Sequence, residues 1–143
     1  MHSNREELRR LMIAINQIDE AYYKVLRTLG ITDNAFVLFY AIADGKTYSQ
    51  KSICYEWSIP RTTLNTIVQE YIKKGYINLV STGRKEKEIV LTDTGKDFVE
   101  KILTPIFLAE EKAISSFIET SFVKQTEQFV EHLKSEFYQI NNT

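Results

Sequence analysis

The chain has 143 residues, a formal net charge of −1 and 43% hydrophobic residues, which suits one compact domain or one intertwined protomer. The apolar run 35–43 is too short to span a bilayer, and the charges interspersed near the amino terminus indicate no signal peptide. A single cysteine, Cys54, excludes an internal disulfide framework and is typical of a reducing cytoplasm.

The first predicted element is a long helix from Ser3 to about Leu29. Ser3 followed by Glu6 is a capping-box pattern. Apolar residues recur at three- and four-residue spacing until Gly30, where a left-handed stop is expected. The apolar stripe is broad, so we expect this helix to bury two of its sides.

A second, almost entirely apolar helix is predicted from Asn34 to Ala43, capped by Thr32 or Asp33. Such a composition is typical of a buried core helix. The segment 47–48, after a turn at 44–46, is predicted to add a short strand to a later hairpin.

A helix-turn-helix follows. Ser49 is a natural N-cap for a helix reaching about Glu56, and residues 57–59 form a turn of the expected length. Pro60 suits the first turn of the next helix, because a missing N–H costs little there. That helix is predicted to run to Lys74 and to be stopped by Gly75.

The second helix of this motif has an apolar side and a polar side without carboxylates. Short amide and hydroxyl groups can pair with base edges in a DNA major groove, and acidic groups would be repelled by phosphate. The alternative is an ordinary polar surface helix. The polar side consists of Thr62, Asn65, Thr66, Gln69 and Lys73.

A β-hairpin with a basic tip is predicted next, because 77–80 and 88–91 alternate apolar and other side chains. Gly83 permits the positive φ angle of a reversal. Arg84 and Lys85 then project from the tip, where an arginine can enter a narrow minor groove. A loop made soluble by its charge is the alternative.

Two further helices are predicted after the hairpin. The first begins near Asp93 after a cap at Thr92, is kinked by Pro105 and keeps helical apolar spacing to Ile118. After a break at 121–123, a last helix spans 124–140, again with an apolar stripe.

Positive charge is concentrated in the helix-turn-helix and hairpin. Residues 46–88 contain eight basic and four acidic side chains, so they carry a charge of +4 in a chain whose total is −1. Such a distribution favours contact with a polyanion at this region, with modest non-specific affinity.

Several motifs of residues 49–95 resemble the winged-helix domain of the MarR family of transcriptional regulators. They are Ser49-Gln50, Pro60-Arg61-Thr62-Thr63-Leu64-Asn65-Thr66, Tyr71-Ile72-Lys73-Lys74-Gly75-Tyr76-Ile77 and Leu91-Thr92-Asp93-Thr94-Gly95. The sequence departs from the family pattern in two places. Gly83-Arg84-Lys85 replaces Asp-x-Arg in the wing, which removes the carboxylate that braces the arginine, and Ser58 replaces the turn glycine.

The resemblance implies a mainly α fold with a small β-hairpin wing, in which 31–95 is a winged helix-turn-helix and 1–30 and 96–143 are dimerisation helices. An enzyme is the weakest of the function classes, because the sequence has no catalytic constellation, and no cofactor is expected. The terminal helices carry more apolar surface than one small core can cover, so we expect a homodimer with two heads spaced for successive DNA turns. A larger monomeric helical core is the alternative.

The resulting hypothesis is a cytoplasmic repressor that binds double-stranded DNA at a palindromic operator. Base contacts are predicted for Arg61, Thr62, Asn65, Thr66 and Gln69. Phosphate contacts are predicted for Ser49, Gln50, Lys51, Thr63 and Lys73. Arg84 and Lys85 are predicted to touch the minor groove. A winged-helix module that binds another protein instead of DNA is the alternative.

The sequence shows no pattern typical of a metal site or of a catalytic site. The two histidines and one cysteine have no metal-site spacing, and no nucleophile–base set or phosphate loop is present. Cys54 is interpreted as a small buried side chain rather than a redox sensor. An aromatic cluster is a candidate pocket for a small-molecule effector, with core packing as the alternative. The cluster comprises Tyr22, Tyr23, Phe36, Phe39 and Tyr40.

Overall fold

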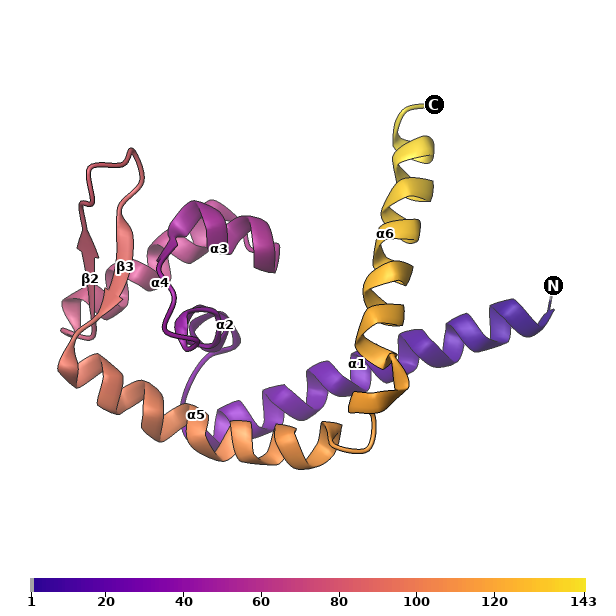
Figure 1. The fold of residues 1–143 in the computed structure, drawn as a ribbon, viewed down its shortest axis with the longest axis horizontal. Coiled ribbons are helices and arrows are strands. Elements are labelled where there is room, and N and C mark those ends of the chain that lie inside the picture. Colours follow the sequence, from indigo (N-terminus) through magenta and orange to yellow (C-terminus); the bar gives the residue numbers. More distant parts are fainter. Residues whose placement is uncertain (1) are drawn as a thin grey trace. The chain divides into compact units, whose positions relative to one another are not determined.

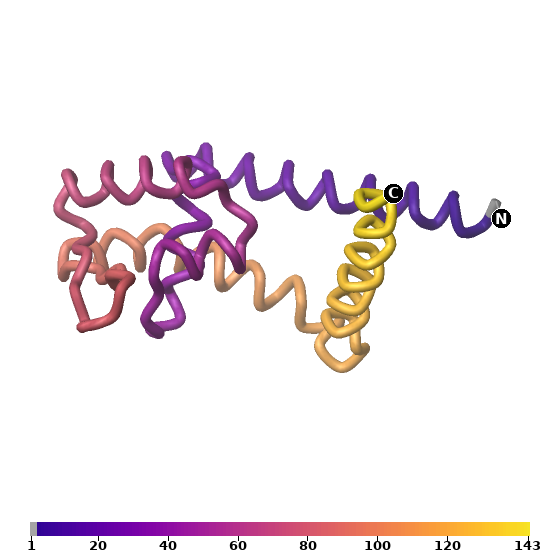
Figure 2. The backbone as a smooth tube through the Cα atoms, turned by 90° about the horizontal axis from the view of Figure 1, so that it is seen from above, coloured from indigo at the N-terminus to yellow at the C-terminus, as the bar shows by residue number. Residues whose placement is uncertain are grey.

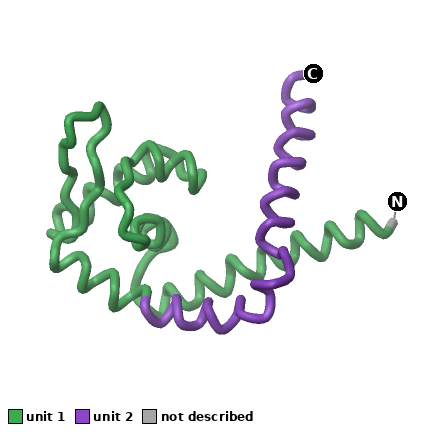
Figure 3. The backbone as a smooth tube through the Cα atoms, viewed as in Figure 1, with its two compact units in different colours: residues 1–103 green, residues 104–143 purple. Residues whose placement is uncertain are grey.

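The computed structural model describes residues 2–143, which form six α-helices and one three-stranded sheet (Figure 1). The elements are α1 (His2–Leu29), α2 (Asp33–Ile42), β1 (Tyr48–Ser49), α3 (Gln50–Trp57), α4 (Arg61–Lys73), β2 (Ile77–Val80), β3 (Glu88–Leu91), α5 (Asp93–Ile114), a 3-10 turn (Ile118–Thr120) and α6 (Phe122–Asn141). The chain divides into two compact units, one up to Leu103 and one from Thr104 to Thr143 (Figure 3). The predicted fold class, a mainly α chain with a winged helix-turn-helix, is confirmed.

The sheet is antiparallel with the order β1-β3-β2. Leu79 of β2 and Tyr48 of β1 both pair with Ile89, so the central strand is held on both sides. Ile77 and Ile89 are buried while Asn78 and Val90 are exposed, as the period-two pattern requires. The predicted hairpin is therefore confirmed, and the predicted third strand lies at Tyr48–Ser49.

The core of the first unit is formed where the end of α1, α2, α3, α4, the wing strands and the start of α5 meet. Its largest fully buried side chains are Leu26, Leu38, Phe39, Ile53, Leu64, Val68, Ile77 and Leu103. Phe39 packs edge-on against Tyr71 with ring centroids 4.7 Å apart, and Tyr76 stacks on Phe98, also at 4.7 Å. This packing fixes the side of α4 that remains available for a partner.

One threonine joins the end of α4 to the start of α5. Thr92 Oγ1 donates to the Gly75 carbonyl at 2.6 Å and accepts from the Gly95 N–H at 3.0 Å. The Thr92 N–H donates to the Tyr76 carbonyl at 3.0 Å. A Cβ on Gly95 would lie 2.0 Å from that carbonyl oxygen. The Leu-Thr-x-x-Gly motif therefore encodes a close crossing of two backbone segments.

The local stop and start signals around the helix-turn-helix are confirmed. Ser49 caps α3, and Gly75 has φ +79° at the end of α4. Ser58, in place of the turn glycine, also adopts a left-handed conformation, with φ 52°. Thr32 rather than Asp33 caps α2, and its hydroxyl accepts from the Ala35 N–H at 3.3 Å.

Three details toward the two ends of the chain differ from the predictions. α1 begins at His2, so Ser3 lies inside the helix rather than at its cap. The C-terminal break starts earlier than predicted, because α5 ends at Ile114 and Ile118 belongs to the 3-10 turn. α6 begins at Phe122, after Ser121 in a left-handed conformation, rather than at 124. Pro105 lies inside α5.

The two ends of α1 have different environments within the first unit. Leu26 is 1% exposed and packs in the core, whereas Met12 and Ile18 are 49% and 53% exposed. Figure 2 shows the N-terminal half of α1 extending away from the winged-helix region.

No single helix of residues 2–143 is long and apolar enough to cross a membrane. Only α1 and α2 taken together, a pair bent by 93°, pass a test of length and composition for a membrane span.

Candidate nucleic-acid interface

The polar side of α4 faces outward along its whole length. Thr62, Asn65, Thr66 and Gln69 are all exposed, while the opposite side of the helix enters the core. Leu64 and Val68 anchor it there with no exposed surface. The Thr66 hydroxyl donates to the Thr62 carbonyl at 3.0 Å, which leaves its oxygen as an acceptor toward a partner.

The C-terminal end of α4 carries a separate charged group. Lys74 Nζ lies 3.1 Å from Glu70 Oε1 and 4.8 Å from the centroid of the Tyr71 ring. The hydrogen bond to Glu70 raises the pKa of Lys74, and burial raises the pKa of the Tyr71 hydroxyl. Lys73, the predicted phosphate contact, is exposed beside this group.

The start of α3 is fixed by a reciprocal cap. Ser49 Oγ accepts from the Ser52 N–H, and Ser52 Oγ accepts from the Ser49 N–H, both at 3.1 Å. The Ser49 oxygen is therefore an acceptor within the cap, which leaves its O–H for any phosphate. Gln50 and Lys51 lie in the following turn, half-buried and exposed respectively.

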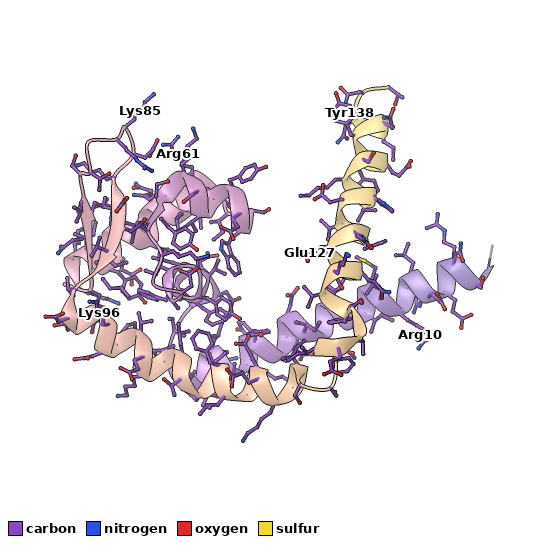
Figure 4. All side chains as sticks on the ribbon, viewed as in Figure 1. Arg10, Arg61, Lys85, Lys96, Glu127 and Tyr138 are labelled. Carbon is purple, nitrogen blue, oxygen red and sulfur yellow. The ribbon has the colours of Figure 1, made fainter. Side chains whose placement is uncertain are left out.

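A hollow of about 490 Å³ separates the helix-turn-helix from the wing tip. It brings together four predicted DNA contacts of α3 and α4, namely Gln50, Arg61, Thr62 and Asn65, with Lys85 of the wing. Figure 4 shows Arg61 and Lys85 on the same side of the first unit. The remaining predicted contacts lie outside its lining: Ser49, Lys51, Thr63, Thr66, Gln69, Lys73 and Arg84.

The hollow also contains residues that the sequence did not single out. Leu79, Glu86 and Lys87 complete its lining. Glu86 Oε1 lies 3.7 Å from Arg61 Nη2, and their side chains are 38% and 70% exposed. The wing tip and the first residue of α4 are thus joined by an ion pair that crosses the hollow. The only feature of the sequence that could have indicated this ion pair is that Glu86 is the one acidic residue among the basic residues of the tip.

Solved structures match the chain over most of its length, although no protein-family model and no curated protein matches it. A MarR family regulator from Neisseria meningitidis is 20% identical with a TM-score of 0.80, and the match covers 95% of this chain and 97% of that one. A MarR family transcriptional regulator from Silicibacter pomeroyi is 14% identical with a TM-score of 0.69, covering 88% and 93%. The PcaV transcriptional regulator from Streptomyces coelicolor, in complex with its natural ligand, is 12% identical with a TM-score of 0.62, covering 86% and 91%.

The chain has the MarR winged-helix fold.

An aromatic series connects three helices of this MarR-type fold. Ring centroids are 5.7 Å apart between Tyr22 of α1 and Phe36 of α2, 5.2 Å between Phe36 and Tyr40, and 5.7 Å between Tyr40 and Trp57 of α3. Phe39 is not part of this series. It is 1% exposed and belongs to the core, where it packs on Tyr71 and Phe98.

The two terminal helices of the MarR-type fold, α1 in the first unit and α6 in the second, each expose a long apolar stripe. In α1, Leu11, Ile15 and Ile18 are 39%, 41% and 53% exposed. No residue of α6 is buried, and its apolar side chains repeat at three- and four-residue spacing. These are Val130, Leu133, Phe137 and Ile140. An apolar stripe of this length is typical of a helix–helix interface.

No group of three or more metal-ligating side chains occurs within residues 2–143. Cys54 is half-buried in α3, and its carbonyl accepts from the Ser58 and Ile59 N–H groups at the helix end. The predicted burial of the Cys54 side chain is therefore only partial.

Proposed function

We propose that this protein is a homodimeric DNA-binding transcriptional regulator that recognises a palindromic operator and acts as a repressor in the cytoplasm. The observation that carries the proposal is the exposed, carboxylate-free side of α4 beside a hollow that also contains a wing lysine. Hydrogen-bonding side chains on a helix of this kind match the major groove, and a wing beside such a helix can reach the adjacent minor groove.

Within this proposal, the contacts divide into three groups. Arg61, Thr62, Asn65, Thr66 and Gln69 approach base edges. Ser49, Gln50, Lys51, Thr63 and Lys73 hold phosphates, which fix the register but carry no sequence information. Arg84 and Lys85 reach the minor groove.

The homodimer is supported by the apolar stripes of α1 and α6. A chain that exposes an apolar stripe on each of two helices is a candidate for association, and a two-fold dimer would present two heads to the halves of a palindrome. The expected behaviour is a single dimeric species in sedimentation velocity at micromolar concentration.

Release by a small molecule is a further part of the proposal. The aromatic series of Tyr22, Phe36 and Tyr40 touches both α1 and the helix-turn-helix, so a ligand there would contact both. Phe39, another residue of the predicted cluster, would have to leave the core to contribute. The ligand-bound PcaV structure supports an effector site in a protein of this fold.

The decisive experiment is selection of bound duplexes from a random-sequence library. Enrichment of a palindromic site with half-sites about one helical turn apart supports the proposal. The alternative, a winged-helix module that binds protein, is favoured by Glu86 in the hollow and by the net charge of −1. No enrichment over repeated rounds, with a folded dimeric protein, would favour that alternative.

A further inference from the structure

The hollow between α4 and the wing contains four charged side chains of unequal sign. Arg61, Lys85 and Lys87 are basic, and Glu86 is the acidic residue of the lining. A carboxylate in a surface that approaches phosphate is electrostatically unfavourable, since it lowers attraction toward every duplex whatever its sequence. Its presence at this place therefore calls for a physical explanation.

A contribution to the stability of the fold does not explain why Glu86 lies in the hollow. The contact between Glu86 and Arg61 is a single pair at 3.7 Å between side chains that are 38% and 70% exposed. Exposed pairs of this geometry contribute little to folding, because water and salt screen them and two long side chains lose freedom. The explanation is better sought in what the pair does to Arg61.

Arg61 is the first residue of α4, and Glu86 lies on the wing, 25 positions later in the chain. Glu86 Oε1 lies 3.7 Å from Arg61 Nη2, which is an ion-pair distance rather than a hydrogen bond. A guanidinium has five N–H donors in a fixed plane, so one partner can set the orientation of that plane and leave other donors for a base edge. A wing residue can thus act on the recognition helix.

We propose that Glu86 is a specificity-determining positioning residue that holds Arg61 in orientation and offsets one positive charge of the interface. Binding to random-sequence DNA, which depends on phosphate neutralisation, is weakened by that offset. Binding to the operator retains the Arg61 contact because the side chain is already oriented. This inference rests on the proposed DNA-binding function and identifies how that function discriminates between sites.

The test uses the full-length protein with Glu86→Gln and the matched control Glu20→Gln. Glu20 forms an exposed pair with Lys24 on α1 at 3.2 Å, outside the hollow, so both variants lose one carboxylate from a surface ion pair. Each protein is titrated by fluorescence anisotropy with the selected duplex and with a scrambled duplex of the same length and composition, over a series of salt concentrations.

Glu86→Gln is expected to bind the scrambled duplex more tightly, with a log–log salt slope steeper by about 0.9 per protomer, as for one more neutralised phosphate. Its ratio of selected to scrambled affinity should fall by about fivefold or more, the lower end of the discrimination of one base contact. Glu20→Gln should match the wild type in slope and ratio. Equal behaviour of the two variants would overturn the inference.

A double-mutant cycle separates positioning from charge alone. In an Arg61→Gln background, adding Glu86→Gln should leave the affinity ratio unchanged, because the positioned group is gone. An equal fall of the ratio in both backgrounds would show that Glu86 does not act through Arg61.

The scrambled-duplex titration distinguishes failure of this inference from failure of the proposed function. Without any selected site the proposed function fails, while the slopes on random DNA still compare Glu86→Gln with Glu20→Gln. Identical slopes would then remove the role of Glu86 as well. A steeper slope for Glu86→Gln alone would still support its charge offset.

Discussion

Replacement of Gly95 by alanine tests the close crossing of backbone segments at the start of α5. Intrinsic helix propensity alone predicts that alanine in place of glycine stabilises a helix by up to about 1 kcal/mol. The structure predicts the opposite sign. The added Cβ would meet the Tyr76 carbonyl oxygen at 2.0 Å and its carbonyl carbon at 2.9 Å, and both belong to the backbone, which cannot rotate away.

The magnitude follows from the groups that must shift. Relieving the overlap requires backbone displacement, which costs about 1–3 kcal/mol in a packed site. The Thr92 N–H bond to the same carbonyl, at 3.0 Å, would be weakened or lost, at about 1 kcal/mol. After subtraction of the propensity gain, we expect a net destabilisation of about 1–3 kcal/mol, or a fall in Tm of about 2–12 °C.

The assay is urea unfolding followed by circular dichroism, at one fixed chain concentration because the stability of any protein that self-associates depends on concentration. Thr94→Ala is the control, since Thr94 is exposed in the same helical turn, and it should stay within about 0.5 kcal/mol of the wild type. A Gly95→Ala protein as stable as the wild type, or more stable, would refute the steric argument.

Three further outcomes are expected. Arg84→Ala should lower affinity for all duplexes and reduce the log–log salt slope by about one per protomer, and an unchanged slope would remove the wing tip from the interface. The Tyr48 hydroxyl, whose pKa is raised to about 12, donates to Asp44 at 2.5 Å and holds the pKa of that carboxyl below 3.8. Tyr48→Phe should therefore raise the Asp44 pKa in an NMR titration, and the stabilisation by this pair should be lost as pH falls through the depressed pKa. Leu133→Asp should shift the protein to monomers in sedimentation velocity, whereas Ser135→Asp, away from the apolar stripe, should remain dimeric.

Much of the helix-turn-helix was predictable because its signals are local. The Ser49 cap and the Gly75 stop depend on residues within four positions of each helix end, so the sequence locates α3 and α4 to within one residue. The outward side of α4 followed from apolar residues at helical spacing.

The ion pair in the hollow could not be predicted in the same way. Arg61 and Glu86 meet only because β2 and β3 pair in a register with Val80 opposite Glu88, which brings the tip back toward α4. No pattern in the sequence specifies that distance. The exclusion of Phe39 from the aromatic series likewise depends on which neighbours surround it, which periodicity does not reveal.

The C-terminal break was misplaced for a different reason. Phe117 and Ile118 continue the apolar spacing of α5, so the pattern predicts helix, yet both residues lie beyond the helix end at Ile114. Ser121 takes a left-handed conformation with φ 60° there, although it is not a glycine. Hydrophobic spacing alone does not locate such a break.

Thr92 has a consequence for how a signal would travel through this protein. Its hydroxyl bonds simultaneously to the carbonyl that ends the α4 segment and to the first turn of α5. A movement of the first turn of α5 would therefore be transmitted to Gly75 and, through it, to the end of α4. The Thr92 hydroxyl thus adds to the link that the Thr92 N–H and the Tyr76 carbonyl already make, and Thr92→Val, which keeps the shape and removes the hydroxyl, would weaken that link.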